Sequence, residues 1–290
     1  MQTVPWPFIA KEMLEAGALT FRELRRFHCA VYPGVWVPRG VDISAIDRAR
    51  AAWLWSHRSG VLAGLSASAL LGAKWIGPEV PAELIHSNRR APRMLTVHSD
   101  TLTPRETQSI AGMTVTSPAR TAFDLGRRLV LANGLQRVDA LMNATDLKAV
   151  EVEAVMADHP GARGLAGLRR TLDLADGGAE SPYETMTRLL LLENGFPRPQ
   201  TQIPVYDERG ILFARIDMGW PEYRVGVDFE GAHHWTDPRQ RSKDVERYAR
   251  LPELDWVDVR VTSSMLHNSP RVFLDRVGRA LTARGCPRTW

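Results

Sequence analysis

The stretch that decides the fold is Arg215-Ile-Asp-Met-Gly-Trp-Pro-Glu-Tyr-Arg-Val-Gly-Val-Asp-Phe-Glu-Gly-Ala-His-His-Trp235. Its apolar residues predict two strands joined by a short turn at Trp220-Pro-Glu222. We expect the first strand to end with Asp217. We expect Asp228 and Glu230 to share one face of the second strand, because side chains two residues apart point the same way. Acidic side chains within an apolar strand are costly unless they are paired, protonated or bound to a metal. The stretch therefore predicts a site of three carboxylates at strand ends.

The length of 290 residues predicts two domains, or three small ones. No run of about 18 apolar residues occurs, so we expect no membrane span. The first ten residues have no charged lead before an apolar run, so we expect no secretory signal. Cys29 and Cys286 lie near opposite ends of the chain and predict neither a disulfide framework nor a zinc site. A reduced, cytoplasmic setting is therefore expected.

The net charge of +4 is unevenly distributed along the chain. From Gly177 onward there are 16 basic and 16 acidic residues, so the whole excess lies in the first 176 residues, with 21 basic and 17 acidic. Nearly all of the basic residues are arginine, whose forked donors suit phosphate groups. A genome rich in G and C explains the arginines equally well. The charge thus gives only weak support for a nucleic-acid partner.

Residues 1–42 have the order helix, turn, basic helix and hairpin, which is typical of a winged helix-turn-helix. Thr20 and Glu23 predict a capping box at the start of the second helix. That helix is expected to bury an apolar face and to expose a basic one. The apolar face would carry Phe21, Leu24 and Phe27, and the DNA-contacting residues would be Arg22, Arg25, Arg26 and, from the hairpin, Arg39. The alternative is a solvated basic face on a protein-binding domain.

Residues 43–176 predict a second, α/β region that would serve as a helper domain. Strands are expected at 82–86, 95–98 and 113–116, and helices at 45–57, 65–71, 118–128, 135–142 and 148–157. Ser117 and Pro118 predict the start of one of these helices, with serine as the N-cap and proline in the first turn. A basic turn contains Arg89, Arg90 and Arg93. This turn either contacts nucleic acid or is a solvated loop.

Residues 177–290 predict an α/β domain with a mixed sheet. Ser181-Pro-Tyr-Glu184 predicts a helix start with a capping box. The helix would run to Asn194. Strands would follow at 200–205, 213–218 and 223–229, then a helix at 243–251, a strand at 255–261 and a closing helix at 273–283.

The carboxylates of this domain predict a magnesium or manganese site. Glu184, Asp217, Asp228 and Glu230 offer the hard oxygen atoms that Mg²⁺ prefers. A cation bound there can activate water and neutralise charge on an attacked phosphate. His234, or its neighbour His233, would be a general acid or a positioning donor. The alternatives are a plain capping-box glutamate at 184, surface carboxylates at the other three positions and structural histidines.

Residues 180–262 resemble the small restriction-endonuclease-like family related to the very-short-patch repair endonucleases, within the PD-(D/E)xK superfamily. The matching pieces, in the family's order, are Ser181–Glu184, Asp217, Asp228–His234, Asp244–Arg247 and Asp255–Arg260. The resemblance implies that Glu184, Asp217 and Asp228 are catalytic or metal-binding, that Glu230 takes the second acidic position, and that His234 is the motif histidine. It also implies that Asp244 and Arg247 support the site.

The sequence departs from that family's pattern at three points. Asp228 and Glu230 invert the usual order of glutamate and aspartate, Asp255 stands where glycine is common, and no lysine follows the acidic position. Exchanging carboxylates of different length moves a bound metal by about one methylene, which matters at a site that needs roughly 0.5 Å precision. The nuclease fold is therefore predicted more strongly than nuclease activity.

The first 176 residues are similar to the N-terminal part of abortive-infection type IV antitoxins. The similarity rests on residues 19–40, 64–72 and 115–124. It implies a winged helix that binds promoter DNA, followed by a helper domain, and a cognate toxin as a partner. Two functions follow as hypotheses. The first is a DNA-binding protein with a Mg²⁺-dependent endonuclease domain, acting in phage defence or DNA repair. The second is a non-catalytic regulator or antitoxin with an inactive nuclease fold.

Overall fold

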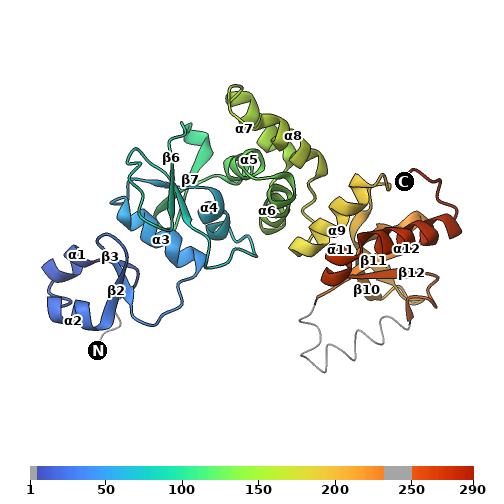
Figure 1. Cartoon of the computed structure of the whole chain (residues 1–290), viewed down its shortest axis with the longest axis horizontal. Coiled ribbons are helices and arrows are strands. Elements are labelled where there is room, and N and C mark those ends of the chain that lie inside the picture. The colour runs from blue at the N-terminus through green and yellow to red at the C-terminus, as the bar shows by residue number, and fades with distance from the viewer. Residues whose placement is uncertain (1–4, 232–249) are drawn as a thin grey trace. The chain divides into compact units, whose positions relative to one another are not determined.

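The computed structural model describes residues 5–231 and 250–290. The chain forms two compact units, Met1–Ala175 and Asp176–Trp290, each with its own core (Figure 1). Both units combine helices with sheets, so the predicted multidomain, mixed α and β architecture is confirmed. The winged helix and the nuclease fold stay predictions. Within the described ranges, no helix is both long enough and apolar enough to cross a membrane.

The first unit begins with two short helices and a three-stranded sheet. The elements are β1 (Phe8–Ile9), α1 (Ala10–Glu15), α2 (Phe21–Phe27), β2 (His28–Tyr32) and β3 (Val35–Pro38), and the strand order is β1-β3-β2. The capping box of Thr20 and Glu23 is present in both directions. The first helix begins at Ala10, because Phe8 and Ile9 before it pair with β3.

Helix α2 corrects the expected apolar face. Leu24 is buried, but 62% of Phe21 and 41% of Phe27 is exposed. The helix has only seven residues and rests on a small cluster around Phe8 and Ala10. A helix of two turns reaches such a cluster with a single side chain, so the residues at its two ends stay in solvent.

A five-stranded sheet follows in the same unit, with strand order β6-β5-β4-β8-β7. Its elements are α3 (Ala45–Trp55), β4 (Val61–Leu62), α4 (Gly64–Leu70), β5 (Ala82–Ile85), β6 (Leu95–His98), η1 (Pro104–Glu106), β7 (Thr107–Ile110) and β8 (Met113–Thr116). Helices α3 and α4 pack against β5. Their core also contains Tyr32 and Val35, so the N-terminal three-stranded sheet and the five-stranded sheet share buried residues.

Four helices complete the first unit: α5 (Pro118–Arg128), α6 (Leu131–Ala144), α7 (Ala149–Asp158) and α8 (Leu165–Leu174). Helix α5 packs against the other three. It is capped by Ser117, whose Oγ accepts a hydrogen bond from the backbone N–H of Arg120, and Pro118 follows in the first turn. The predicted start of this helix is therefore confirmed.

The second unit is a four-stranded mixed sheet with helices. Its elements are α9 (Pro182–Glu193), β9 (Gln200–Tyr206), β10 (Leu212–Trp220), η2 (Pro221–Tyr223), β11 (Val225–Glu230), β12 (Val257–Thr262), α11 (Ser263–Asn268) and α12 (Pro270–Ala283). The strand order is β12-β11-β10-β9, and only β11 and β12 are parallel.

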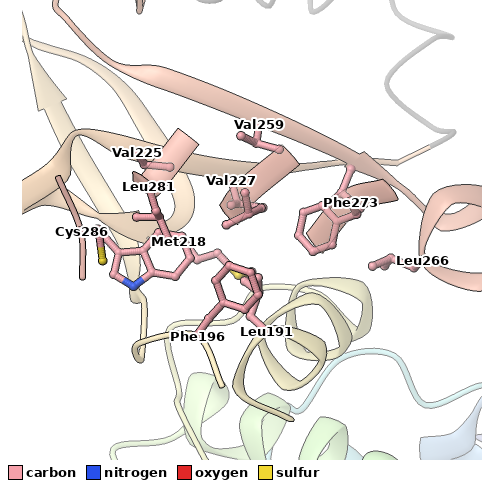
Figure 2. Packing of buried hydrophobic residues seen from close by; sticks show 13 residues of the cluster. Leu191, Phe196, Met218, Val225, Val227, Val259, Leu266, Phe273, Leu281 and Cys286 are labelled. Carbon is pink, nitrogen blue, oxygen red and sulfur yellow. The ribbon is translucent and has the colours of Figure 1, made fainter. Parts of the chain in front are cut away.

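The core of this unit lies between the sheet and helices α9 and α12. Met218, Val227 and Val259 of the strands pack with Leu191 of α9 and Phe273 of α12 (Figure 2). Met218 and Val227 are the chain neighbours of Asp217 and Asp228, so the strands that carry these carboxylates are anchored by buried apolar side chains.

The structure corrects the expected position of Asp217. Strand β10 continues to Trp220, so Asp217 lies within the strand and not at its end. The reason is that Met218 and Trp220 are buried and extend the pairing with β11. Most of the helix expected at 243–251 lies outside the described residues.

Candidate functional site

Asp217 and Asp228 join strands β10 and β11 through their side chains. Oδ1 of Asp228 accepts a hydrogen bond from the backbone N–H of Asp217 at 2.9 Å, and Oδ2 of Asp217 accepts one from the backbone N–H of Phe229 at 2.7 Å. Asp228 is only 2% exposed. Backbone N–H groups thus hold one oxygen of each carboxylate, which fixes their positions on the sheet.

Glu184 is held at the start of α9. Ser181 is the N-cap, because its Oγ accepts a hydrogen bond from the backbone N–H of Glu184 at 3.2 Å. The predicted capping box is incomplete, since Oε2 of Glu184 accepts the N–H of Glu180, at 2.8 Å, one residue before the cap. Burial raises the pKa of Glu184, and the N–H of Glu180 and the Ser181 hydroxyl only partly offset this effect. Burial therefore favours the protonated form of Glu184.

Gln202 of β9 contacts Glu184 and stands opposite Asp217 in the sheet, and it was not among the predicted site residues. Its Nε2 donates to Oε2 of Glu184 at 3.2 Å. Its position in β9 lies opposite Asp217, between the pairs Ile216–Ile203 and Met218–Thr201. Gln202 also has a φ of 55°, a left-handed conformation that is uncommon for a non-glycine residue. The only sequence signal was a polar side chain next to Ile203 in an otherwise regular strand.

A row of polar residues therefore crosses the sheet. Gln202, Asp217, Asp228 and Arg260 stand opposite one another on the four strands. Arg260 donates from Nη1 to Glu230 at 3.1 Å and from Nε to Asp258 at 3.3 Å. The expected carboxylate Glu230 is thus ion-paired, and an arginine from β12 is the cation beside it.

The oxygen atoms of this row are of the chemical type that a hard cation such as Mg²⁺ prefers as ligands. They are carboxylate oxygens and the Oε1 atom of Gln202, which is buried and has no hydrogen-bond partner among the described residues. However, residues 5–231 and 250–290 contain no group of three or more His, Cys, Asp or Glu side chains arranged to bind a metal ion. His233, His234, Asp244 and Arg247 lie outside the described residues. The magnesium or manganese site and these roles remain predictions.

Asp255 explains one departure from the nuclease-like pattern. Its φ is 64°, a left-handed conformation in which glycine is common and aspartate is tolerated. Arg284 donates from Nη1 to its Oδ1 and from Nη2 to its backbone oxygen, both at 2.9 Å. The aspartate therefore keeps the bend before β12 that a glycine would make.

Helix α2 carries an exposed basic surface. Arg22, Arg25 and Arg26 are exposed, and none of them forms an ion pair within the described part of the chain. The guanidinium of Arg25 lies 5.7 Å from the ring centre of Phe21, and that of Arg26 lies 5.1 Å from that of Phe27. These three cations therefore keep their charge available to an anionic partner.

Arg39 belongs to the same region but has a structural contact. Its Nη2 donates to the backbone oxygen of Arg25 at 3.2 Å, close to the end of α2. A guanidinium at this place satisfies a carbonyl that has no partner within the helix. A contact between Arg39 and DNA stays a prediction.

A buried network of charges lies in the first unit and was not predicted. Arg120 is 1% exposed and donates to Glu106 at 2.7 Å and to Asp124 at 3.0 Å. Glu106 also lies 2.5 Å from Nε2 of His159. Asp100 binds Arg127 and Arg128 at the edge of the same network. The sequence carried a signal for its centre, since Arg120 and Asp124 are four residues apart on the helix that Ser117 caps.

Comparison with known proteins concerns mainly this first unit. Residues 61–174 match the family described as the AbiEi antitoxin C-terminal domain. The match runs from β4 to the end of α8 and so includes the sheet and the four helices around Arg120. The predicted similarity to antitoxins is therefore confirmed for residues 61–174, although the match is to a C-terminal domain and the prediction was the N-terminal part.

Two relatives come from Mycobacterium tuberculosis, strains CDC 1551 / Oshkosh and H37Rv, and both are described as uncharacterized proteins. Each is 31% identical to this chain over 174 residues, which is 60% of this chain and 64% of the relative. The chain thus spans less than two thirds of the length of these relatives. No solved structure matches the chain. The resemblance of residues 180–262 to nucleases stays a prediction.

Proposed function

We propose that this protein is a DNA-binding regulator of the antitoxin type that contacts DNA through helix α2. The observation that carries the proposal is the exposed set of Arg22, Arg25 and Arg26, which have no carboxylate partner within the described ranges. Exposed guanidinium groups without a carboxylate partner complement the phosphate groups of DNA in charge and in hydrogen-bond geometry. The match of residues 61–174 to an antitoxin domain supports a regulatory role.

The same match makes a cognate toxin the second partner in this proposal. Such an antitoxin has one site for DNA and one for the toxin. If the two sites communicate, binding of one partner changes the free energy of binding the other. The α2 arginines belong to the DNA-binding side of this scheme.

The test measures binding to the DNA upstream of the protein's own gene by fluorescence anisotropy at several salt concentrations. The variant Arg22→Ala/Arg25→Ala/Arg26→Ala should weaken binding. It should also reduce the slope of log K against log salt by roughly 0.9 for each phosphate that the protein no longer neutralises. The control, Arg105→Ala/Arg163→Ala/Arg169→Ala, removes three exposed arginines of the same unit. If both triple variants bind alike, α2 is not the DNA-contacting element.

We propose as a second function that the Asp176–Trp290 unit hydrolyses phosphodiester bonds. The observation in its favour is the polar row of Gln202, Asp217 and Asp228, which Glu184 joins through Gln202. Asp217 and Asp228 would hold Mg²⁺ or Mn²⁺, with Oε1 of Gln202 as a neutral oxygen. Such a cation supplies charge neutralisation and an activated water.

The other predicted residues would act around that cation. Glu184 would orient the attacking water, Glu230 would take the second acidic position and His234 would be the acid or a positioning donor. Asp244 and Arg247 would support these groups.

This second function is tested by incubating plasmid DNA with the whole protein and Mg²⁺ or Mn²⁺. Asp217→Ala should abolish cleavage, whereas Glu208→Ala, which removes an exposed carboxylate from the turn between β9 and β10, should leave it unchanged. Intact plasmid with the unmodified protein, in a preparation that binds DNA, would reject the enzyme and leave the regulator.

A further inference from the structure

The loop between β5 and β6 carries a second group of exposed arginines. Arg89, Arg90 and Arg93 are all exposed. The loop has a defined backbone, because Oδ1 of Asn88 accepts the N–H of Arg90 at 3.0 Å and Nδ1 of His86 accepts the N–H of Asn88 at 3.0 Å. The arginines are thus presented from an ordered turn.

These arginines differ from the other group of arginines in the same unit. Arg120, Arg127 and Arg128 all contact carboxylates. Arg90 and Arg93, in contrast, form no ion pair within residues 5–231 and 250–290, and Arg89 donates only to the neutral hydroxyl of Ser99 at 2.8 Å. Three cations within five residues repel one another unless an anion neutralises them. The loop therefore carries three positive charges, as the α2 surface does. Unlike the arginines of the buried network, its arginines have no carboxylate partner among the described residues.

A direct contact joins this loop to β2, the strand that follows α2. Tyr32, at the end of β2, donates its hydroxyl to the backbone oxygen of Met94 at 2.7 Å. Burial raises the pKa of Tyr32 to about 12, so this hydroxyl stays protonated and remains a donor at neutral pH. Arg58, which follows α3, donates two hydrogen bonds of 2.6 and 2.7 Å to the carboxylate of Glu12. This ion pair joins α1, the helix before α2, to the segment after α3.

The path between the two basic surfaces is short. Strand β2 follows α2 without a break and has five residues, His28–Tyr32. At about 3.3 Å per residue the strand spans roughly 15 Å. Met94, the residue after Arg93, lies against the tip of the Tyr32 side chain. The end of α2 thus lies about one strand length from Tyr32, which is shorter than one turn of DNA, about 34 Å.

We propose that the loop of Arg89, Arg90 and Arg93 is a second DNA contact, which binds the phosphate backbone beside the site occupied by α2. The inference rests on the proposed DNA-binding function and extends it to the antitoxin-like sheet. Because the loop offers guanidinium groups to phosphates, it adds affinity and salt dependence without adding sequence preference. A short connection favours this addition, because the second contact forms at a high effective concentration once the first is made.

The experiment uses the whole protein, the duplex upstream of its own gene and a shuffled duplex of the same length. The variant Arg90→Ala/Arg93→Ala should reduce the magnitude of the slope of log K against log salt by about 2, because each phosphate that is no longer neutralised contributes roughly 0.9. The ratio of affinities for the two duplexes should stay unchanged. The control Arg163→Ala/Arg169→Ala removes two exposed arginines that lie near or on α8. It should leave the slope as it is.

A second variant tests the contact between β2 and the arginine loop. Tyr32→Phe keeps the buried ring but removes the hydrogen bond to Met94, and it should lower the affinity for both duplexes by the same factor. The proposal is overturned if Arg90→Ala/Arg93→Ala and the control give the same slope while the α2 triple variant still weakens binding. If the unmodified protein binds neither duplex, the proposed function itself fails, and this inference fails with it.

Discussion

Glu106 of the first unit and Glu184 of the second are buried glutamates that are held in different ways. In the first unit, Glu106 and Asp124 contact the guanidinium of Arg120, which is itself buried. In the second unit, the hydrogen bonds to Glu184 come from the backbone N–H of Glu180 and from the amide of Gln202. A guanidinium thus neutralises Glu106, whereas dipoles donate the hydrogen bonds to Glu184.

The pKa values show the consequence of this difference. Burial raises the pKa of Glu106, but the bonds from His159, Thr103 and Arg120 outweigh it and lower the pKa overall. At Glu184 burial is the larger effect, and the pKa is raised. A carboxylate that a guanidinium neutralises is a structural element, whereas a carboxylate whose pKa burial raises keeps a proton affinity that chemistry or a bound cation can use.

The largest expected effect comes from removing the cation of the first unit. Arg120→Met should destabilise that unit by about 3 to 5 kcal/mol, because Glu106 and Asp124 would stay buried without their shared guanidinium. Hydrogen exchange of the α5 amides gives the loss for this unit alone. Arg163→Met, an exposed arginine, should change it by less than about 0.5 kcal/mol. Equal effects of the two variants would show that the buried guanidinium of Arg120 does not stabilise Glu106 and Asp124.

A smaller effect is expected from removing a carboxylate of the second unit. Asp228→Ala should destabilise that unit by about 1 to 3 kcal/mol, because the N–H of Asp217 loses its acceptor. Asp228→Asn keeps an oxygen at this place and should lose clearly less. Urea unfolding with hydrogen exchange at β10 and β11 measures both. An asparagine variant as unstable as the alanine variant would show that the charge of Asp228, and not its oxygen, holds the strands.

The smallest effect concerns pH and has opposite signs in the two units. The raised pKa of Glu184 means that the folded unit binds a proton that the unfolded chain releases. Its free energy of unfolding therefore falls as the pH rises from the ordinary value of 4.5 through the raised pKa. Glu184→Gln should remove this loss, so the variant should be the more stable protein at neutral pH and gain nothing below 4.5.

Glu106 should behave in the reverse way. Its lowered pKa contributes stability that is present above 4.5 and is lost as the pH falls through the folded value. Glu106→Gln should thus destabilise the first unit at neutral pH, with a deficit that shrinks on acidification. Thermal unfolding of both variants across this pH range checks the two signs. The comparison between the units fails if the signs agree.

Local signals in the sequence predicted elements well where one or two residues determine the backbone. Thr20 with Glu23, and Ser117 with Pro118, fixed helix starts, because a cap needs only a side chain and an N–H three residues away. The apolar face of α2 was predicted incorrectly, since burial of Phe21 and Phe27 depends on how large a core the rest of the chain provides.

The candidate site shows the same division. Asp217 and Asp228 were found from their position in apolar strands, because a charged residue there is costly without a partner. Gln202 was not found, since its importance comes from the register of β9 against β10 and from a contact with a helix 18 residues earlier. The network of Arg120, Glu106 and His159 joins a helix, a turn and the end of another helix, and no local pattern contains all three.

The sequence by itself determined where the helices with a side-chain cap begin, which strands carry acids, that the excess positive charge lies in the first 176 residues, and the similarity to an antitoxin domain. Only the tertiary structure decided which charges are neutralised. Arg120 and Arg90 are the same residue type in the same unit, yet one is buried among carboxylates and the other is exposed without any in the described chain. The physical reason is that propensity and capping act over three or four residues, whereas the free energy of a charge depends on burial and on partners that the fold brings from distant segments.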